Sequence, residues 1–176
     1  MTVELIREGV AAAAVVSYEF RAVRRLEAEG IGRPGKRTFR LCAENDAGSA
    51  TIWTEKEHIA RLALAIRHMM GTHEDSRKRQ RSLPEVPSAA PLIRLSISFH
   101  ADRFELGYEA KTGEFTLYAH DWEIDETAPH TFSCCLPRGQ LEALASNIEM
   151  VCAAGRPVCD VCGFPMTRGA HIHRAE

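Results

Sequence analysis

The stretch from Thr38 to Met70, TFRLCAENDAGSATIWTEKEHIARLALAIRHMM, contains the features that predict the fold. Apolar and polar residues alternate in Thr38–Cys42 and again in Ser49–Trp53, which is typical of strands with one buried face. The residues between them, Asn45-Asp-Ala-Gly48, favour a tight turn. We therefore expect an antiparallel hairpin in this part of the chain.

A helix is predicted directly after this hairpin. Thr54 is followed three residues later by Glu57, the spacing of a capping box at a helix N-terminus. Apolar residues then recur at helical spacing, which predicts one buried face. These residues are Ile59, Leu62, Ala63, Ile66 and Met70.

The second half of the chain repeats the order of strands followed by a helix. Alternating segments and a final helical stripe predict strands near Leu92–Phe99, Phe104–Tyr108, Phe115–Ala119 and Thr131–Leu136, then a helix from Pro137 to Gly155. Hairpin-linked strands form antiparallel sheets, and each sheet needs cover on its apolar face. The predicted fold class is therefore α+β, with antiparallel β-sheets each covered by a helix and a C-terminal zinc knuckle.

The predicted organisation has four parts. Residues 1–71 form an N-terminal strands-plus-helix half, and residues 92–155 form a matching C-terminal half. A basic, proline-rich linker at 72–91 separates them because it lacks an apolar period. Residues 156–176 form the zinc knuckle.

Composition and charge limit the classes of function. The net charge of −2 gives no overall field that would attract nucleic acid or a membrane surface. The N-terminal residues are charged, and the apolar run from Val10 to Val16 is too short to span a bilayer. We expect a cytoplasmic protein without membrane contact, in which the six cysteines are reduced.

Four potential metal ligands lie close together near the C-terminus. Cys159 and Cys162 form a C-x-x-C pair, and His171 and His173 are two residues apart, so they would project from the same face of an extended segment. Two thiolates and two imidazoles complete a tetrahedral Zn²⁺ shell and leave no position for water. The spacing therefore predicts a structural zinc site and not a catalytic one.

Other interpretations of these residues stay open. The thiols could be unmetallated, or they could form a redox pair, although Gly163 and Pro165 would break the helix that such a pair requires. If only one histidine binds, Cys152 or His120 could supply the fourth ligand.

Two basic clusters suggest a second class of function. The first consists of Arg33, Lys36 and Arg37, and the second of Arg77, Lys78, Arg79 and Arg81. Such clusters neutralise phosphates, so RNA or DNA binding is the alternative hypothesis. A solvated linker is the favoured explanation of the second cluster.

An enzymatic function is the third hypothesis. His100-Ala-Asp102 and His120-Asp121 place imidazoles beside carboxylates at strand ends, and Cys134-Cys135 precedes a helix. Alternation sends one of these cysteines into the core, where thiols are usually inert. We therefore expect no catalytic residue and no small-molecule substrate. His58 and His68 are expected at the polar edge of their helix.

Three stretches together carry a resemblance to a known family. They are GRPGKRTFRL at 32–41, AAGRPVC at 153–159, and CGFP at 162–165 followed by Gly169-Ala-His171. This sequence resembles an uncharacterised bacterial family, domain-of-unknown-function family 3090, whose members carry PGxRTFxL early and end in AAGRPxCxxCGxPxxxxGHxC. His173 stands where the family usually has cysteine. The resemblance covers about residues 22–173 and implies a metal knuckle on an α+β body, without an implied activity.

These observations favour a non-catalytic zinc-binding protein that acts as an interaction or scaffold module in a larger assembly. A protein partner is expected, and the sequence does not identify it.

Overall fold

The computed structural model describes residues 16–73, 94–125 and 127–155. The zinc motif of residues 156–176 and most of the predicted linker lie outside these ranges. The elements in chain order are β1 (Tyr18–Phe20), β2 (Arg25–Arg33), β3 (Lys36–Asn45), β4 (Gly48–Thr54), α1 (Lys56–Thr72), β5 (Leu95–Glu109), β6 (Glu114–Asp121), β7 (Phe132–Leu136) and α2 (Arg138–Ala153). The α+β class and the order of strands then a helix, twice, are confirmed.

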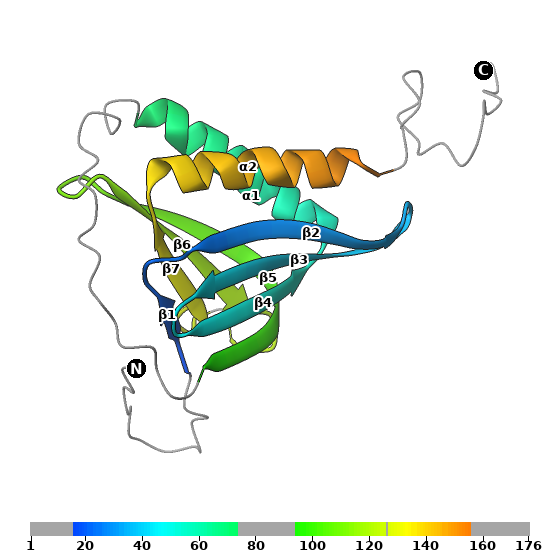
Figure 1. The fold of residues 1–176 in the computed structure, drawn as a ribbon, viewed down its shortest axis with the longest axis horizontal. Helices are drawn as coiled ribbons and strands as arrows, with labels where there is room; N and C mark the ends of the chain where they lie inside the picture. The colour runs from blue at the N-terminus through cyan, green and yellow to red at the C-terminus, as the bar shows by residue number, and fades with distance from the viewer. Residues whose placement is uncertain (1–15, 74–93, 126, 156–176) are drawn as a thin grey trace.

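The strands form one seven-stranded mixed sheet in the order β1-β7-β6-β5-β4-β3-β2 (Figure 1). The prediction of separate antiparallel sheets is therefore wrong, because β4 pairs in parallel with β5 and β1 pairs in parallel with β7. The physical reason lies in the connection between the halves. The connection from β4 to β5 contains helix α1, and a long crossover connection of this kind joins strands that run in the same direction.

Strand β5 joins the two halves of the sheet. The sequence predicted two strands here, but the structure has one 15-residue strand with a register shift between Ala101 and Arg103. Residues Leu95–His100 pair with β4, and residues from Ala101 onward pair with β6. The bulge thus lies where β5 exchanges one neighbouring strand for the other, and a bulge of this kind bends the strand and redirects its side chains.

Both helices lie on one face of the sheet and cross each other (Figure 1). Helix α2 packs along β2, and α1 packs against α2 and β5, so each helix contacts strands of the other half. The side-chain oxygen of Asn147 accepts a hydrogen bond from the Ala28 amide at 2.6 Å, and Gln140 donates to the Val23 carbonyl at 3.0 Å. One continuous core results, and the predicted stripe of α1 is buried in it.

The predicted capping box at the start of α1 does not form. Glu55 is the N-cap residue and makes no side-chain capping bond. Thr54 is instead the last residue of β4, where it is buried on the same face as Ala50 and Ile52. Its hydroxyl therefore points into the core and away from the first amides of the helix.

The turn between β3 and β4 forms as predicted. The Asn45 side-chain oxygen accepts hydrogen bonds from the amides of Ala47 and Gly48, both at 2.9 Å. A Cβ atom at Gly48 would lie 2.0 Å from the Leu95 carbonyl oxygen, so the close approach of β5 requires glycine at this position.

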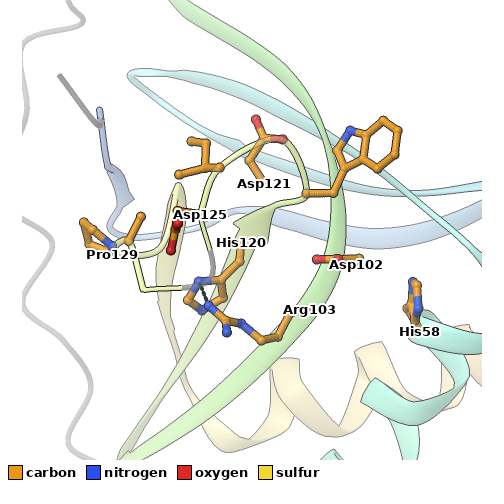
Figure 2. A pocket seen from close by; sticks show the side chains of 10 residues that line it. His58, Asp102, Arg103, His120, Asp121, Asp125 and Pro129 are labelled. Atoms are coloured by element: carbon orange, nitrogen blue, oxygen red, sulfur yellow. Dashed lines mark hydrogen bonds between the residues drawn. The ribbon is translucent and has the colours of Figure 1, made fainter. Parts of the chain in front are cut away.

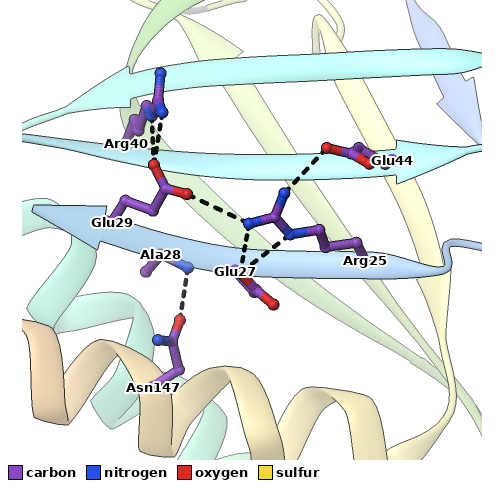
Figure 3. Close-up of polar contacts among 7 residues, drawn as sticks. All are labelled: Arg25, Glu27, Ala28, Glu29, Arg40, Glu44 and Asn147. Atoms are coloured by element: carbon purple, nitrogen blue, oxygen red, sulfur yellow. Dashed lines mark hydrogen bonds and ion pairs between the residues drawn. The ribbon is translucent and has the colours of Figure 1, made fainter.

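The opposite face of the first half is covered by ion pairs (Figure 3). Arg25 contacts Glu27, Glu29 and Glu44, and Arg40 makes two hydrogen bonds to Glu29 at 2.6 and 2.8 Å. These partly exposed pairs neutralise most of the charge on this face. Neither α1 nor α2 is long and apolar enough to cross a membrane.

Candidate functional site

A pocket of about 380 Å³ lies beside the bulge of β5. It is built from the bulge itself, the end of β6, the start of α1 and the loop that follows β6. Its polar lining consists of His58, Asp102, Arg103, His120, Asp121 and Asp125, and its other lining residues are Trp122, Ile124, Ala128 and Pro129. In Figure 2, His58 and Asp125 lie toward opposite ends, with Asp102, Arg103 and His120 between them.

His120 is held between two charged side chains on β5. Arg103 Nη2 lies 2.7 Å from His120 Nδ1, and Glu105 Oε1 lies 3.3 Å from His120 Nε2. Because a guanidinium can only donate, Nδ1 must accept, so the ring is neutral and carries its proton on Nε2. Burial lowers the pKa of His120, and the charge of Arg103 lowers it further, while Glu105 acts in the opposite direction.

The three carboxylates of the pocket differ in their local contacts. Asp125 accepts hydrogen bonds from the Thr127 amide and hydroxyl, which lower the pKa of this carboxyl group. Asp121 accepts a hydrogen bond from the Glu123 amide at 3.1 Å. The Asp102 side chain is exposed and has no hydrogen bond or ion pair within the ranges that the structure describes. Its carboxylate is therefore available to a ligand.

A second region of interest lies at the far end of α2. The turn between β2 and β3 carries the first predicted basic cluster, in which Arg33 and Lys36 are exposed. Arg37 is half-buried and donates a hydrogen bond to the Val151 carbonyl of α2 at 3.4 Å. A Cβ atom at Gly30 would lie 3.2 Å from the Val151 side chain. The early sequence motif thus lies against the last turn of α2, just before the terminal motif begins.

Comparison with known proteins now adds the family. The sequence matches the family described as "Protein of unknown function (DUF3090)" over residues 18–173. The chain belongs to this family. No curated protein and no solved structure matches it. The family resemblance drawn from the two motifs is confirmed.

The zinc ligands predicted for this family member, Cys159, Cys162, His171 and His173, lie outside the described residues, and so do Arg77, Lys78, Arg79 and Arg81. Of the two substitute ligands, Cys152 is half-buried on α2, and both ring nitrogens of His120 face other side chains. Within the described ranges, no group of three or more His, Cys, Asp or Glu side chains could hold a metal ion.

The residues singled out for the enzyme hypothesis are partly brought together. Asp102, His120 and Asp121 line one pocket, whereas His100 is exposed and its ring contacts the rings of Trp53 and Trp122. The lone pair of the His120 ring is occupied by Arg103, so this imidazole is not a free general base.

Cys134 does not have the environment that a nucleophilic cysteine needs. Cys134 is completely buried, as alternation predicted for one member, and burial raises the pKa of its thiol. A raised pKa removes the thiolate that nucleophilic attack needs. Cys135 is half-buried, and its sulfur lies 3.8 Å from the Thr116 hydroxyl.

Sequence reasoning missed several residues of the pocket, Arg103 and Asp125 among them. His58 was expected at the polar edge of its helix, but it lines the pocket, and its buried Nδ1 has no hydrogen-bond partner in the described part of the chain. Trp122 was not considered. The available signal was the cluster of carboxylates and imidazoles at the ends of two predicted strands, which pairing of β5 with β6 brings together.

Proposed function

We propose that this protein is a non-catalytic zinc-binding interaction module, in which Cys159, Cys162, His171 and His173 hold one structural Zn²⁺ ion. The observation that carries the proposal is the attachment of Arg37 to the end of α2. Because Arg37 donates to the Val151 carbonyl, the β2–β3 turn supports the helix from which the ligand-bearing segment continues.

Further contacts at this end support the same interpretation. The carbonyl groups in the last turn of a helix carry partial negative charge, which a guanidinium stabilises. A Cβ atom at Gly155 would lie 3.3 Å from the Cys152 carbonyl oxygen and 3.5 Å from Lys56 Nζ, so the chain leaves α2 between close neighbours. A firmly held helix end is a suitable base for a small metal-bound recognition element.

Metal analysis of the purified full chain tests the zinc site. We expect about one Zn²⁺ per chain, since four soft or borderline ligands complete a tetrahedral shell. Substitution Cys159→Ser combined with Cys162→Ser should abolish binding, whereas Cys42→Ser, which changes a half-buried cysteine on β3, should leave the stoichiometry unchanged. Substoichiometric zinc in the wild-type protein, or retention by the double variant, would contradict the proposal.

The role in interaction is tested with the same three proteins. Cross-linked complexes recovered from the native host should contain specific partners with the wild-type chain and with Cys42→Ser, but not with the double variant. Partners that are recovered equally with all three proteins would show that the zinc site is a stability element and not a recognition element.

Nucleic-acid binding is the second candidate function. It is supported by a difference in ion pairing among the basic residues of the surface. Arg21, Arg24, Arg25, Arg40 and Arg67 all form ion pairs with carboxylates. By contrast, Arg33 and Lys36 at the turn make no ion pair within the described residues. Their charges are therefore free to contact phosphates.

Fluorescence anisotropy with single-stranded RNA and DNA, repeated over a salt series, measures this contact. If the turn binds phosphates, the double substitution Arg33→Glu and Lys36→Glu should weaken binding and reduce the salt dependence by about two counterions. Lys111→Glu, on the exposed turn between β5 and β6, is the matched control. Absence of a salt-sensitive signal in the wild-type protein would exclude this function.

A further inference from the structure

The pocket beside β5 has a chemistry that the proposed function does not use. We propose that it binds a small organic cation, in which an ammonium or guanidinium group is attached to an apolar or aromatic stem. This inference concerns Asp102, Asp121, Asp125 and Trp122, and it is independent of the zinc motif and of the basic turn.

The charge of the lining favours a cation. Three carboxylates, those of Asp102, Asp121 and Asp125, line the pocket together with one guanidinium, that of Arg103. Arg103 already donates to His120 Nδ1, and its Nε lies 3.5 Å from Glu105 Oε1 outside the pocket lining, so its charge is partly compensated there. The pocket therefore retains net negative charge, which attracts a positively charged group.

Asp102 is the carboxylate that we expect to contact the cation directly. Asp102 is the residue inserted between the paired residues Ala101 and Arg103, so the bulge removes it from the regular alternation of β5. Its side chain makes no hydrogen bond or ion pair within the described ranges, whereas the other two carboxylates each accept bonds from the following loop. A charge-assisted hydrogen bond from a ligand would satisfy it.

The loop after β6 also gives the pocket apolar lining residues. These are Trp122, Ile124, Ala128 and Pro129. The Trp122 side chain is 61% exposed, which is unusual for the largest apolar residue of a chain. An indole face next to carboxylates is a favourable environment for a cation with an apolar stem. The carboxylates and the apolar residues together therefore favour a ligand that has a positive charge and an apolar stem.

Intrinsic fluorescence provides a direct test, because the chain has two tryptophans and one of them lines the pocket. In a Trp53→Phe background, Trp122 is the single reporter. Titration with benzylamine should give a saturable change with a dissociation constant on the order of 1 mM, a typical affinity for so small a ligand. Benzoate, which has the same ring and the opposite charge, should give no saturable change.

Two pocket variants and one control variant, all in this background, assign the signal to the pocket. Asp102→Asn should weaken benzylamine binding about tenfold or more, since it removes a charge-assisted bond. Glu114→Gln, at the other end of β6, should have no effect. Asp102 is exposed and without partners, so its substitution should not disturb folding, and a far-ultraviolet circular dichroism spectrum checks this. Trp122→Leu, followed by calorimetry, is the second variant and should also weaken binding.

Equal binding of benzoate, or unchanged benzylamine affinity in Asp102→Asn, would overturn the proposal. Linear, non-saturating quenching by benzylamine in the wild-type pocket would also overturn it. None of these outcomes depends on zinc content, so a failure here is distinguishable from a failure of the proposed function.

Discussion

Among the charged residues of the described ranges, Arg138 is the most deeply buried, with 6% of its surface exposed. It begins α2 and extends to the end of α1, where it donates to the carbonyl oxygens of Met70 at 2.9 Å and His73 at 2.8 Å. Its Nε donates to Glu142 at 2.8 Å. One side chain thus satisfies the open carbonyls of one helix and fixes the start of the other.

Substitution Arg138→Ala should lower the free energy of unfolding by roughly 2–4 kcal/mol, because buried carbonyls and the Glu142 carboxylate lose their donor. Arg138→Lys should recover only part of this loss, since an ammonium lacks the planar fork that reaches several acceptors. Urea titrations followed by circular dichroism measure both changes.

Arg67→Ala is the control for this prediction. Arg67 also joins the two helices, through Glu149 and Ser146, but its side chain is 43% exposed. Its loss should leave the urea midpoint close to that of the wild-type protein, because exposed ion pairs contribute little. A similar shift for both arginines would show that the buried contacts of Arg138 are not the stabilising ones.

At the scale of the element, the sequence correctly predicted the buried faces of strands and helices that have a regular apolar pattern. Phe39 and Leu41 on β3 and the apolar stripe of α1 are buried as expected, because one repeating pattern specifies one buried face. The long strand β5 was divided in two, because the inserted residue Asp102 interrupts the alternation and resembles a turn. Thr54 was assigned as a helix cap, because its sequence context does not reveal that its side chain faces the core.

The candidate pocket could be predicted only in part for a related reason. His120 and Asp121 are adjacent in the sequence, and pairing of β5 with β6 brings Asp102 close to them. His58 joins them through the packing of α1 against β5, a contact between distant parts of the chain. Local patterns do not determine such contacts, so the residue types were recognised but not their common location.

At the scale of the whole molecule, the helix of each half packs against strands of the other half. Helix α2 covers β2 of the first half, and α1 contacts β5 of the second half. Each set of strands is thus covered mainly by the helix of the other half. A chain built in this way should unfold as a single cooperative unit.

The two tryptophans allow this cooperativity to be measured. Trp53 lies in β4 of the first half, and Trp122 follows β6 in the second half. The variants Trp122→Phe and Trp53→Phe each leave one reporter. Each variant is unfolded in urea and followed both by fluorescence and by circular dichroism. For each variant, the two transitions should coincide. A fluorescence midpoint displaced from the circular dichroism midpoint would show that the halves unfold separately.

The bond between Asn147 and the Ala28 amide has a consequence for the behaviour of many copies in solution. Strand β2 ends the sheet, and a free strand edge can template the addition of a foreign strand, which is how aggregates begin. Here a side chain from α2 occupies the middle of that edge at 2.6 Å. The same contact that fastens the helix therefore also blocks the addition of a foreign strand at this point of the β2 edge.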